Sequence, residues 1–532
     1  MRHGTCLSLL LCVMFSLIAG SASESGVSPS LTCLTEELQR EMHVEAKAMF
    51  LRMFSAYMEH AFPSDELLPL TCEGSDTFGG MLVTLVDNLD TLLVMGELEL
   101  FQDALEDVKE YLDFDLDVEV SVFETNIRVL GGLISTHMLL TSPKVEAMGL
   151  SEVAGRYDGF LLSLATDLAD RLLPAFATET DIPYGTVNLR HGVPINETTE
   201  ASVAGGGTYL LEFILLSRLT GNPAYQAAAL RASYAIYDSR TDLDLFGSHI
   251  DIQHGGWTVH EGGLGAGMDS YLEYLLKVEH LGMSLRNYEG DRLFEVLQAS
   301  ATKSYVQAGW LIGHHIFQAD VIYPVLNSLS SWWPLSLVMT GRIEDAIAVM
   351  KRLLVAVSRH GFLPEGFNVQ QQLPVMGQLG YPLRPEVFES LYYIYSATGD
   401  RSWLQAAYEM WGAIQHLEEE QEAIVGACGI AAVKNVITRE RENRMESFFL
   451  SETLKYIYLM SQDPKEKEQH AFYQLDQVLF TTEAHLIPLS HPVVTNRFED
   501  SDADLRTVEE SNSRARIRQS AHSLSSCSIS FA

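Results

Sequence analysis

Residues 209–222 read YLLEFILLSRLTGN, an apolar stretch with helical spacing that ends in a glycine. Gly221 favours the left-handed backbone that terminates a helix, and the polar residue after it favours the start of another. Three more apolar stretches end in the same way, at Gly96, Gly341 and Gly399. These stretches predict pairs of helices that are joined at a glycine.

The spacing of these four glycines indicates a repeat. They are separated by 125, 120 and 58 residues, all close to multiples of about 60. A unit of about 60 residues suits two antiparallel helices, and about seven such units fill the chain. Helix-glycine-helix turns are common, so coincidence is the alternative explanation. We therefore predict an all-α fold of repeated helical hairpins, arranged as an open solenoid or as a closed barrel.

The two ends of the chain differ from its middle. Residues 1–23 combine a basic start, a short apolar stretch and small residues, which is typical of a cleaved secretory signal; a signal anchor is the alternative. The helical pattern then occupies residues 35–490, and residues 491–532 form a polar tail that we expect to be disordered. No later segment is apolar enough to span a bilayer, so a soluble protein of the secretory lumen is expected. Asn196 begins an N-glycosylation sequon.

Composition and cysteine content narrow the classes of function. The formal charge of -36 argues against nucleic acid or an anionic membrane as a partner, since either would repel the chain. Removal of the signal leaves four cysteines: Cys33, Cys72, Cys428 and Cys527. An oxidising lumen favours disulfides, but the sequence leaves their pairing open. Cys527 lies in the polar tail and is the candidate for a free thiol, or for a mixed disulfide with a thiol oxidoreductase.

Several acidic residues share one local pattern, in which the acid is followed by serine or threonine and then by an apolar run. They are Asp90, Glu124, Asp269, Glu389 and Glu446. Carboxylates at helix starts are stabilised by the free backbone N–H groups there, so ordinary helix-start chemistry is the alternative. All except Glu124 follow the spacing of about 60 residues, and in a closed ring such positions converge at one end.

Converging carboxylates suit two kinds of chemistry. One is glycosidic hydrolysis, in which one acid protonates the leaving oxygen and another carboxylate activates water. The other is binding of a hard cation such as calcium. Arg128 lies one helical turn after Glu124, and Arg384 lies two residues before Glu386, so each arginine can keep a carboxylate ionised or form a plain salt bridge. Pro385 suits a helix start and places Glu386 and Glu389 in one turn.

Two other motifs favour structure over chemistry. Residues 480–485 form a short β-prone segment that ends at His485, which we interpret as an ordinary hydrogen-bonded histidine rather than a ligand or base. Gly205, Gly206 and Gly207 have no strand signal before them, so a loop is expected rather than a phosphate site.

Five segments, in order along residues 40–490, together resemble the class I α1,2-mannosidases. They are Ser121–Arg128, Gly265–Tyr271, Leu383–Glu386, Arg444–Phe449 and Thr482–His485. The resemblance implies an (αα)7 barrel of helical hairpins with a short C-terminal β-hairpin that plugs it. It also implies bound Ca²⁺ and hydrolysis with inversion at the anomeric carbon.

The same resemblance implies roles for individual residues. Glu124 is expected to be the general acid, Glu386 the base that activates water, and Asp269 a further catalytic carboxylate. Thr482 is expected to bind calcium through its hydroxyl and carbonyl oxygens. The remaining residues are expected to bind substrate, line the mannose site or hold calcium-bound waters: Arg128, Arg384, Glu389, Glu446 and Glu483.

Within that family, residues 65–72, 183–193 and 331–334 resemble the ER degradation-enhancing α-mannosidase-like proteins. This implies a disulfide between Cys72 and Cys428, and trimming of mannose from N-glycans of misfolded glycoproteins in the endoplasmic reticulum lumen. The stretch 328–335 lacks the histidine and glycine that processing mannosidases carry there, which puts one subsite in doubt. The alternative function is a mannose-binding, lectin-like receptor with weak or no hydrolysis.

Overall fold

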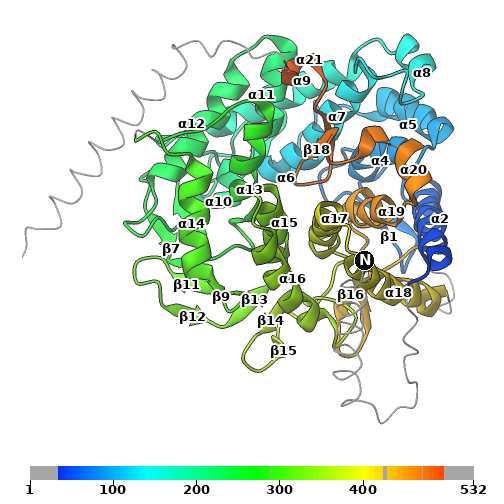
Figure 1. Ribbon diagram of the computed structural model, residues 1–532. Helices are drawn as coiled ribbons and strands as arrows, with labels where there is room; N and C mark the ends of the chain where they lie inside the picture. The colour runs from blue at the N-terminus through cyan, green and yellow to red at the C-terminus, as the bar shows by residue number, and fades with distance from the viewer. Residues whose placement is uncertain (1–33, 288, 423–427, 470, 496–532) are drawn as a thin grey trace, which may run out of the picture. The chain divides into compact units, whose positions relative to one another are not determined.

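The computed structural model describes residues 34–495, except residues 288, 423–427 and 470. The chain divides into two compact units, and Figure 1 labels many of their elements. Among the described residues, unit 1 consists of residues 34–112, 305–313 and 323–478, and unit 2 of residues 113–304, 314–322 and 479–495. Each unit is described by itself below.

Unit 1 contains most of the long helices. Its α-helices are α2 (Glu36–His60), α3 (Val83–Asp87), α4 (Leu89–Val94), α5 (Leu98–Tyr111), α15 (Trp333–Met339), α16 (Ile343–Val357), α17 (Glu386–Thr398), α18 (Arg401–Glu422), α19 (Lys455–Ser461) and α20 (Pro464–Gln469). A π-helical segment, η5 (Phe449–Leu454), leads directly into α19. Its strands are β1 (Glu66–Leu68), β2 (Glu73–Ser75), β9 (Val306–Gln307), β10 (Trp310–Leu311), β13 (Val325–Asn327), β14 (Gly366–Asn368), β15 (Leu373–Pro374), β16 (Ala432–Asn435) and β17 (Glu440–Glu442).

Unit 2 also consists of helices and short strands. Its α-helices are α6 (Val122–Glu124), α7 (Gly131–Leu140), α8 (Ser151–Arg156), α9 (Phe160–Leu172), α10 (Val203–Gly207), α11 (Leu210–Thr220), α12 (Ala224–Asp238), α13 (Asp269–Lys277), α14 (Leu293–Tyr305) and α21 (Pro492–Thr495). A π-helical segment, η1 (Thr125–Leu130), joins α6 to α7. The strands are β3 (Glu119–Ser121), β4 (Thr186–Asn188), β5 (Glu200–Ser202), β6 (His249–Asp251), β7 (Trp257–Val259), β8 (Glu261–Gly262), β11 (Gly313–His315), β12 (Val321–Tyr323), β18 (Val478–Phe480) and β19 (Leu486–Pro488).

The glycine turns predicted from the sequence are confirmed. Gly96, Gly221, Gly341 and Gly399 all adopt positive φ, between 64° and 77°. Each turn joins two helices that pack against each other: α4 and α5, α11 and α12, α15 and α16, and α17 and α18. A positive φ costs glycine little, so these turns follow directly from the local sequence.

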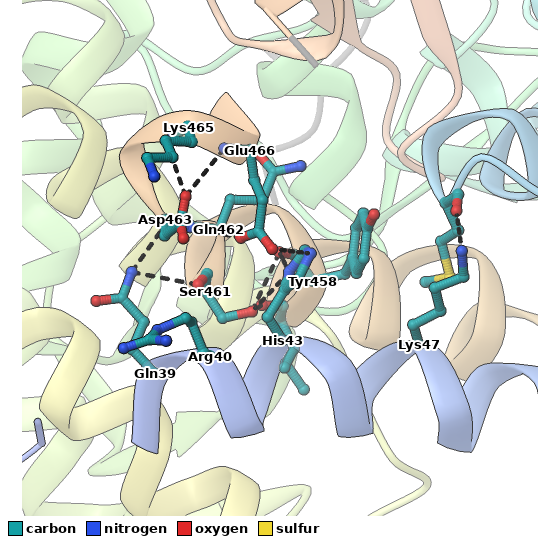
Figure 2. A network of polar contacts seen from close by, with 12 residues as sticks. Gln39, Arg40, His43, Lys47, Tyr458, Ser461, Gln462, Asp463, Lys465 and Glu466 are labelled. Atoms are coloured by element: carbon teal, nitrogen blue, oxygen red, sulfur yellow. Dashed lines mark hydrogen bonds and ion pairs between the residues drawn. The ribbon is translucent and has the colours of Figure 1, made fainter. Parts of the chain in front are cut away.

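Polar contacts attach α2 to α19, the helix that follows η5 (Figure 2). Both helices belong to unit 1. His43 on α2 stacks on Tyr458 with ring centroids 4.1 Å apart, and its Nδ1 lies 3.0 Å from the Tyr458 carbonyl oxygen. One turn earlier, the Gln39 amide donates to the carbonyl oxygens of Ser461 and Gln462 at 3.2 and 3.0 Å. These bonds satisfy carbonyl groups at the C-terminal end of α19, which have no partner within the helix itself.

Helices dominate, as predicted, but the described residues also form eight small sheets of two or three strands. The sequence showed few strand signals because strands of two to four residues are too short for a period-two pattern. The β-prone segment near residue 480 is confirmed, since β18 pairs with β19. The Cys72–Cys428 disulfide is also present, while Cys33 and Cys527 lie outside the described residues.

The expectation of a loop at Gly205, Gly206 and Gly207 is wrong, because these glycines form most of α10 and follow strand β5. A Cβ at Gly207 would collide with the ring of Tyr271, and one at Gly206 would lie 2.8 Å from Ile182. The glycines therefore allow α10 to pack closely against α13. Within the described part of the chain, no helix is both long and apolar enough to cross a membrane.

Candidate active site

The acidic residues singled out in the sequence do lie at helix starts. Asp90, Glu124, Asp269, Glu386 and Glu389 are all in the first turns of helices, and Glu446 directly precedes one. Pro385 is the N-cap residue of α17 and lies just before its first turn. Free backbone N–H groups at these positions stabilise negative charge.

Glu124 belongs to a short, strongly constrained segment of unit 2. Strand β3 ends at Ser121, whose hydroxyl accepts a hydrogen bond from the Glu124 backbone N–H at 3.2 Å. The π-helical segment η1 begins at the next residue. Single turns of π-helix are rare and occur frequently at functional sites, because the wider turn redirects the side chains it carries. Glu124 therefore stands at a change of helical geometry.

Arg128 connects Glu124 with Glu483. Its Nε donates to Glu124 Oε2 at 2.9 Å, and its Nη1 donates to Glu483 Oε2 at 2.7 Å. The side chains of Arg128 and Glu483 are each 8% exposed, whereas that of Glu124 is 34% exposed. Two charge-assisted bonds to one guanidinium fix both carboxylates, and only Glu124 retains substantial contact with solvent. The sequence suggested the pairing with Glu124, but not the one with Glu483.

The turn after β18 holds the predicted calcium ligand. The Thr481 N–H donates to the His485 carbonyl oxygen at 2.9 Å, which closes a turn around half-buried Thr482. The Nζ of Lys277, a fully buried lysine paired with Glu273, lies 3.3 Å from the Thr481 carbonyl oxygen. His485 is buried, with Nε2 3.1 Å from the Arg128 carbonyl oxygen, so the interpretation as a hydrogen-bonded histidine is confirmed.

Asp269 begins α13 and is half-buried. Its Oδ1 accepts the Ser270 backbone N–H at 2.9 Å, as expected of an acid in the first turn of a helix. The Ser270 hydroxyl lies 3.0 Å from the hydroxyl of Thr208. The backbone at the start of α13 thus holds Asp269. Ser270 at that start bonds in turn to Thr208, the residue that follows α10.

In unit 1, Arg384 is held by a carboxylate that the sequence analysis missed. Its Nε and Nη2 donate to the two oxygens of Glu365 at 2.6 and 3.0 Å, and its Nη1 lies 3.9 Å from Glu386 Oε1. Burial alone lowers the pKa of Arg384, but the bond to Glu365 and the charges of Glu386 and Glu446 outweigh it and raise that pKa. The guanidinium therefore stays charged beside Glu386.

The other two predicted residues of unit 1 have separate partners. Glu389, 5% exposed, accepts a hydrogen bond from the Tyr456 hydroxyl at 3.0 Å. Glu446 lies 2.9 Å from Arg444 Nε. Ser447, the residue after Glu446, donates its backbone N–H to buried Glu66 at 3.0 Å. Glu389 and Glu446 are thus held by different side chains of unit 1.

A cavity of about 530 Å³ opens beside Arg384 in unit 1. Eight of its thirteen lining residues carry a polar or charged side chain: Glu365, Gln378, Arg384, Lys434, Asn435, Glu440, Glu442 and Arg444. Amide, carboxylate and guanidinium groups at the wall of a cavity suit a ligand rich in hydroxyl groups, because each can donate to or accept from them.

Glu365 and Glu66 escaped the sequence analysis for the same reason. Neither is followed by a hydroxyl residue at a helix start, which was the pattern that identified the other carboxylates. Glu365 directly precedes β14, and Glu66 begins β1. The one available signal was an acidic residue next to a very short strand, and strands of this length were not predicted. Asn196, the predicted glycosylation position, is exposed.

Comparisons with known proteins identify relatives of this chain. The sequence profile of the family described as "Glycosyl hydrolase family 47" matches residues 49–489. The chain is 40% identical to mouse (Mus musculus) "ER degradation-enhancing alpha-mannosidase-like protein 2" over 85% of this chain and 74% of that protein. It is 39% identical to Arabidopsis thaliana "Alpha-mannosidase I MNS4", over 85% of this chain and 70% of that protein. The solved structure of "alpha-1,2-mannosidase from Trichoderma reesei" is similar with a TM-score of 0.72 and 26% identity, over 85% of this chain and 99% of that one.

Proposed function

The chain belongs to glycosyl hydrolase family 47 and is an α-mannosidase, and from this premise we propose that it trims α1,2-linked mannose from N-glycans of misfolded glycoproteins in the endoplasmic reticulum lumen. Such trimming promotes degradation of the glycoprotein that carries the glycan. The names of the relatives support this substrate and compartment, since several are called ER degradation-enhancing α-mannosidase-like proteins. We also propose the (αα)7 barrel with a C-terminal β-hairpin plug, supported by the glycine-linked helix pairs and by the β18–β19 pair.

Glu124 is the proposed general acid. The observation that carries this proposal is the arrangement around Arg128, which fixes Glu124 at 2.9 Å while leaving its carboxyl group accessible to a ligand. Glu386 is the proposed base, which removes a proton from water as the water attacks the anomeric carbon. Asp269 is the further carboxylate. In this inverting scheme one carboxyl group gives a proton to the leaving oxygen while the other takes one from water.

Calcium is the proposed cofactor, and the donor set fits it. Thr482 offers hydroxyl and carbonyl oxygens at a turn where it is half-buried, and Ca²⁺ prefers such neutral and carboxylate oxygen ligands. Glu389, Glu446 and Glu483 are proposed to bind calcium-bound waters or the sugar. When bound, the ion supplies positive charge that orients sugar hydroxyl groups, while Arg128 and Arg384 keep the acids of this chain in place.

The proposal is tested by mannose release from a denatured high-mannose glycoprotein, measured for wild type and Glu124→Gln with and without a calcium chelator. We expect release by wild type, loss of release in Glu124→Gln by a factor of about 100 or more, and loss on chelation. Glu152→Gln is the matched control, because Glu152 also pairs with an arginine four residues later, but on an exposed helix. It should release mannose like wild type.

Two outcomes contradict the proposal in different ways. Equal release by wild type and Glu124→Gln removes Glu124 from the role of acid. Glycan binding by wild type without any release favours the receptor function instead.

The proposed thiol oxidoreductase partner involves Cys527, outside the described residues, and Cys527→Ser should abolish a mixed disulfide seen under non-reducing conditions.

A further inference from the structure

Glu212 is a further carboxyl group of unit 2, and the sequence analysis did not single it out. It is on α11 and is 1% exposed. Its Oε1 accepts the Tyr274 hydroxyl at 2.5 Å, and its Oε2 accepts Asn126 Nδ2 at 3.1 Å. Burial raises the pKa of Glu212 to about 7. A buried carboxyl group is costly, and this one is satisfied by two donors from two different elements.

One of those donors connects Glu212 with the proposed general acid. Asn126 lies in the π-helical segment η1, two residues after Glu124 and two before Arg128. Its Nδ2 also donates to the Thr208 carbonyl oxygen at 3.0 Å. Because a π-helical turn lacks the regular bonding of an α-helix, a side-chain anchor in the middle of η1 helps to fix where Glu124 and Arg128 lie.

The other donor connects Glu212 with Asp269. Tyr274 lies on α13, five residues after Asp269, and its hydroxyl also interacts with the backbone of Thr482. A parallel connection exists through Thr208, whose hydroxyl lies 3.0 Å from that of Ser270 at the start of α13. Glu212 therefore bonds to both segments that carry a proposed catalytic carboxylate of unit 2.

We propose that Glu212 is a positioning residue, which acts through Asn126 and Tyr274 to hold the segments that carry Glu124 and Asp269 in the arrangement that hydrolysis requires. This inference rests on the proposed function, because the residues it positions are the proposed acid and its companion carboxylate. Glu212 does not itself contact substrate in this scheme. Small displacements of catalytic groups lower turnover strongly, so the loss of Glu212 should appear in kcat.

The geometry requires two acceptor oxygens at this position. Glu212→Gln retains one acceptor but places an amide N–H₂ group opposite Asn126 Nδ2, which is itself a donor. If the Asn126 amide rotates to present its oxygen, that oxygen then faces the Thr208 carbonyl oxygen, which is also an acceptor. If the new amide turns so that its oxygen accepts from Asn126, its N–H₂ group faces the Tyr274 hydroxyl, which must then accept and loses the acceptor of its own proton. The substitution therefore disturbs the bond to Asn126 or the bond to Tyr274, although the volume of the side chain is unchanged.

The test compares the kinetics of the full-length protein carrying single substitutions. Glu212→Gln should lower kcat by about 10-fold or more while KM and glycan affinity change less than about 2-fold. Thr208→Val removes the hydroxyl group that contacts Ser270 and should also lower kcat. Thr208→Ser keeps that hydroxyl group and should have a kcat close to that of wild type. Thr136→Val is the control, because within the described residues the buried Thr136 hydroxyl has no hydrogen-bond partner.

The outcomes separate the inference from the proposed function. If wild type releases no mannose, both fail. If wild type is active and Glu212→Gln keeps a kcat within about 2-fold, only the positioning role is wrong. If Glu212→Gln does not fold, Tyr274→Phe decides, because it removes one of the two donors to Glu212 and changes little else in the side chain: an unchanged kcat contradicts the inference, and a lower kcat with an unchanged KM supports it.

Discussion

Replacing His137 with glutamine should remove a large part of the acid sensitivity of folding. His137 lies on α7 of unit 2, is 7% exposed, and its Nδ1 lies 2.8 Å from the Tyr157 hydroxyl. Burial, with a smaller effect from the charge of nearby His491, lowers the pKa of His137 to about 4 from an unfolded value of 6.5. The folded protein therefore keeps this imidazole neutral over a range in which the unfolded chain binds a proton.

The sign and size of the effect follow from that difference. A lowered histidine pKa means that its contribution to stability is complete above pH 6.5 and is lost as the pH falls from 6.5 to about 4. Between about pH 7.5 and about pH 5, the unfolded state gains most of one proton and the folded state gains little. The free energy of unfolding should fall by about 2 kcal/mol from this residue alone over that interval.

Urea unfolding at the two pH values, followed by tryptophan fluorescence, measures this effect. Other groups titrate as well, so the quantity to compare is the pH-dependent loss of stability in wild type minus that in His137→Gln. We expect this difference to be about 2 kcal/mol. A variant that loses as much stability on acidification as wild type would show that His137 is protonated normally in the folded state, and would refute the reasoning.

Two further predictions concern the stability of unit 1. Lys455 and Asp90 form a fully buried ion pair at 2.9 Å. Lys455→Met leaves the Asp90 charge buried without its cation and should lower the free energy of unfolding by about 3–5 kcal/mol. Adding Asp90→Leu removes that charge and should recover most of the loss. A loss below about 1 kcal/mol in a denaturation curve would contradict this. Cys72→Ser opens a link between residues 356 positions apart and should cost about 5 kcal/mol at most, with the same melting temperature for Cys428→Ser and for the double variant. Different melting temperatures would mean that the two cysteines do not act only as a pair.

The features that the sequence predicted well are those set by nearest neighbours. The turn at Gly221 needs a positive φ, which glycine adopts at little cost, so the helix pair around it is visible in the local sequence. The same is true of Asp269, whose position in the first turn depends on the backbone of its own helix. Such features do not depend on distant contacts.

The features that were missed depend on distant parts of the chain. Glu365 bonds to Arg384 across 19 residues, and Glu212 bonds to Asn126 across 86 and to Tyr274 across 62. No local pattern marks such partners. Gly205, Gly206 and Gly207 were assigned to a loop because no strand signal precedes them. Glycine disfavours a helix by about 1 kcal/mol, and close packing against Tyr271 overrides that preference.

The stereochemistry of the first product tests the central claim most directly. Proton NMR of mannose, recorded in the first minutes of hydrolysis of an α1,2-linked substrate, distinguishes the two anomers before they interconvert. The account predicts that β-mannose is released first, because one carboxyl group protonates the leaving oxygen while a second activates water on the opposite face of the sugar. It also predicts that Glu124→Gln forms neither anomer at a measurable rate. Initial release of α-mannose would contradict the proposed acid and base pair.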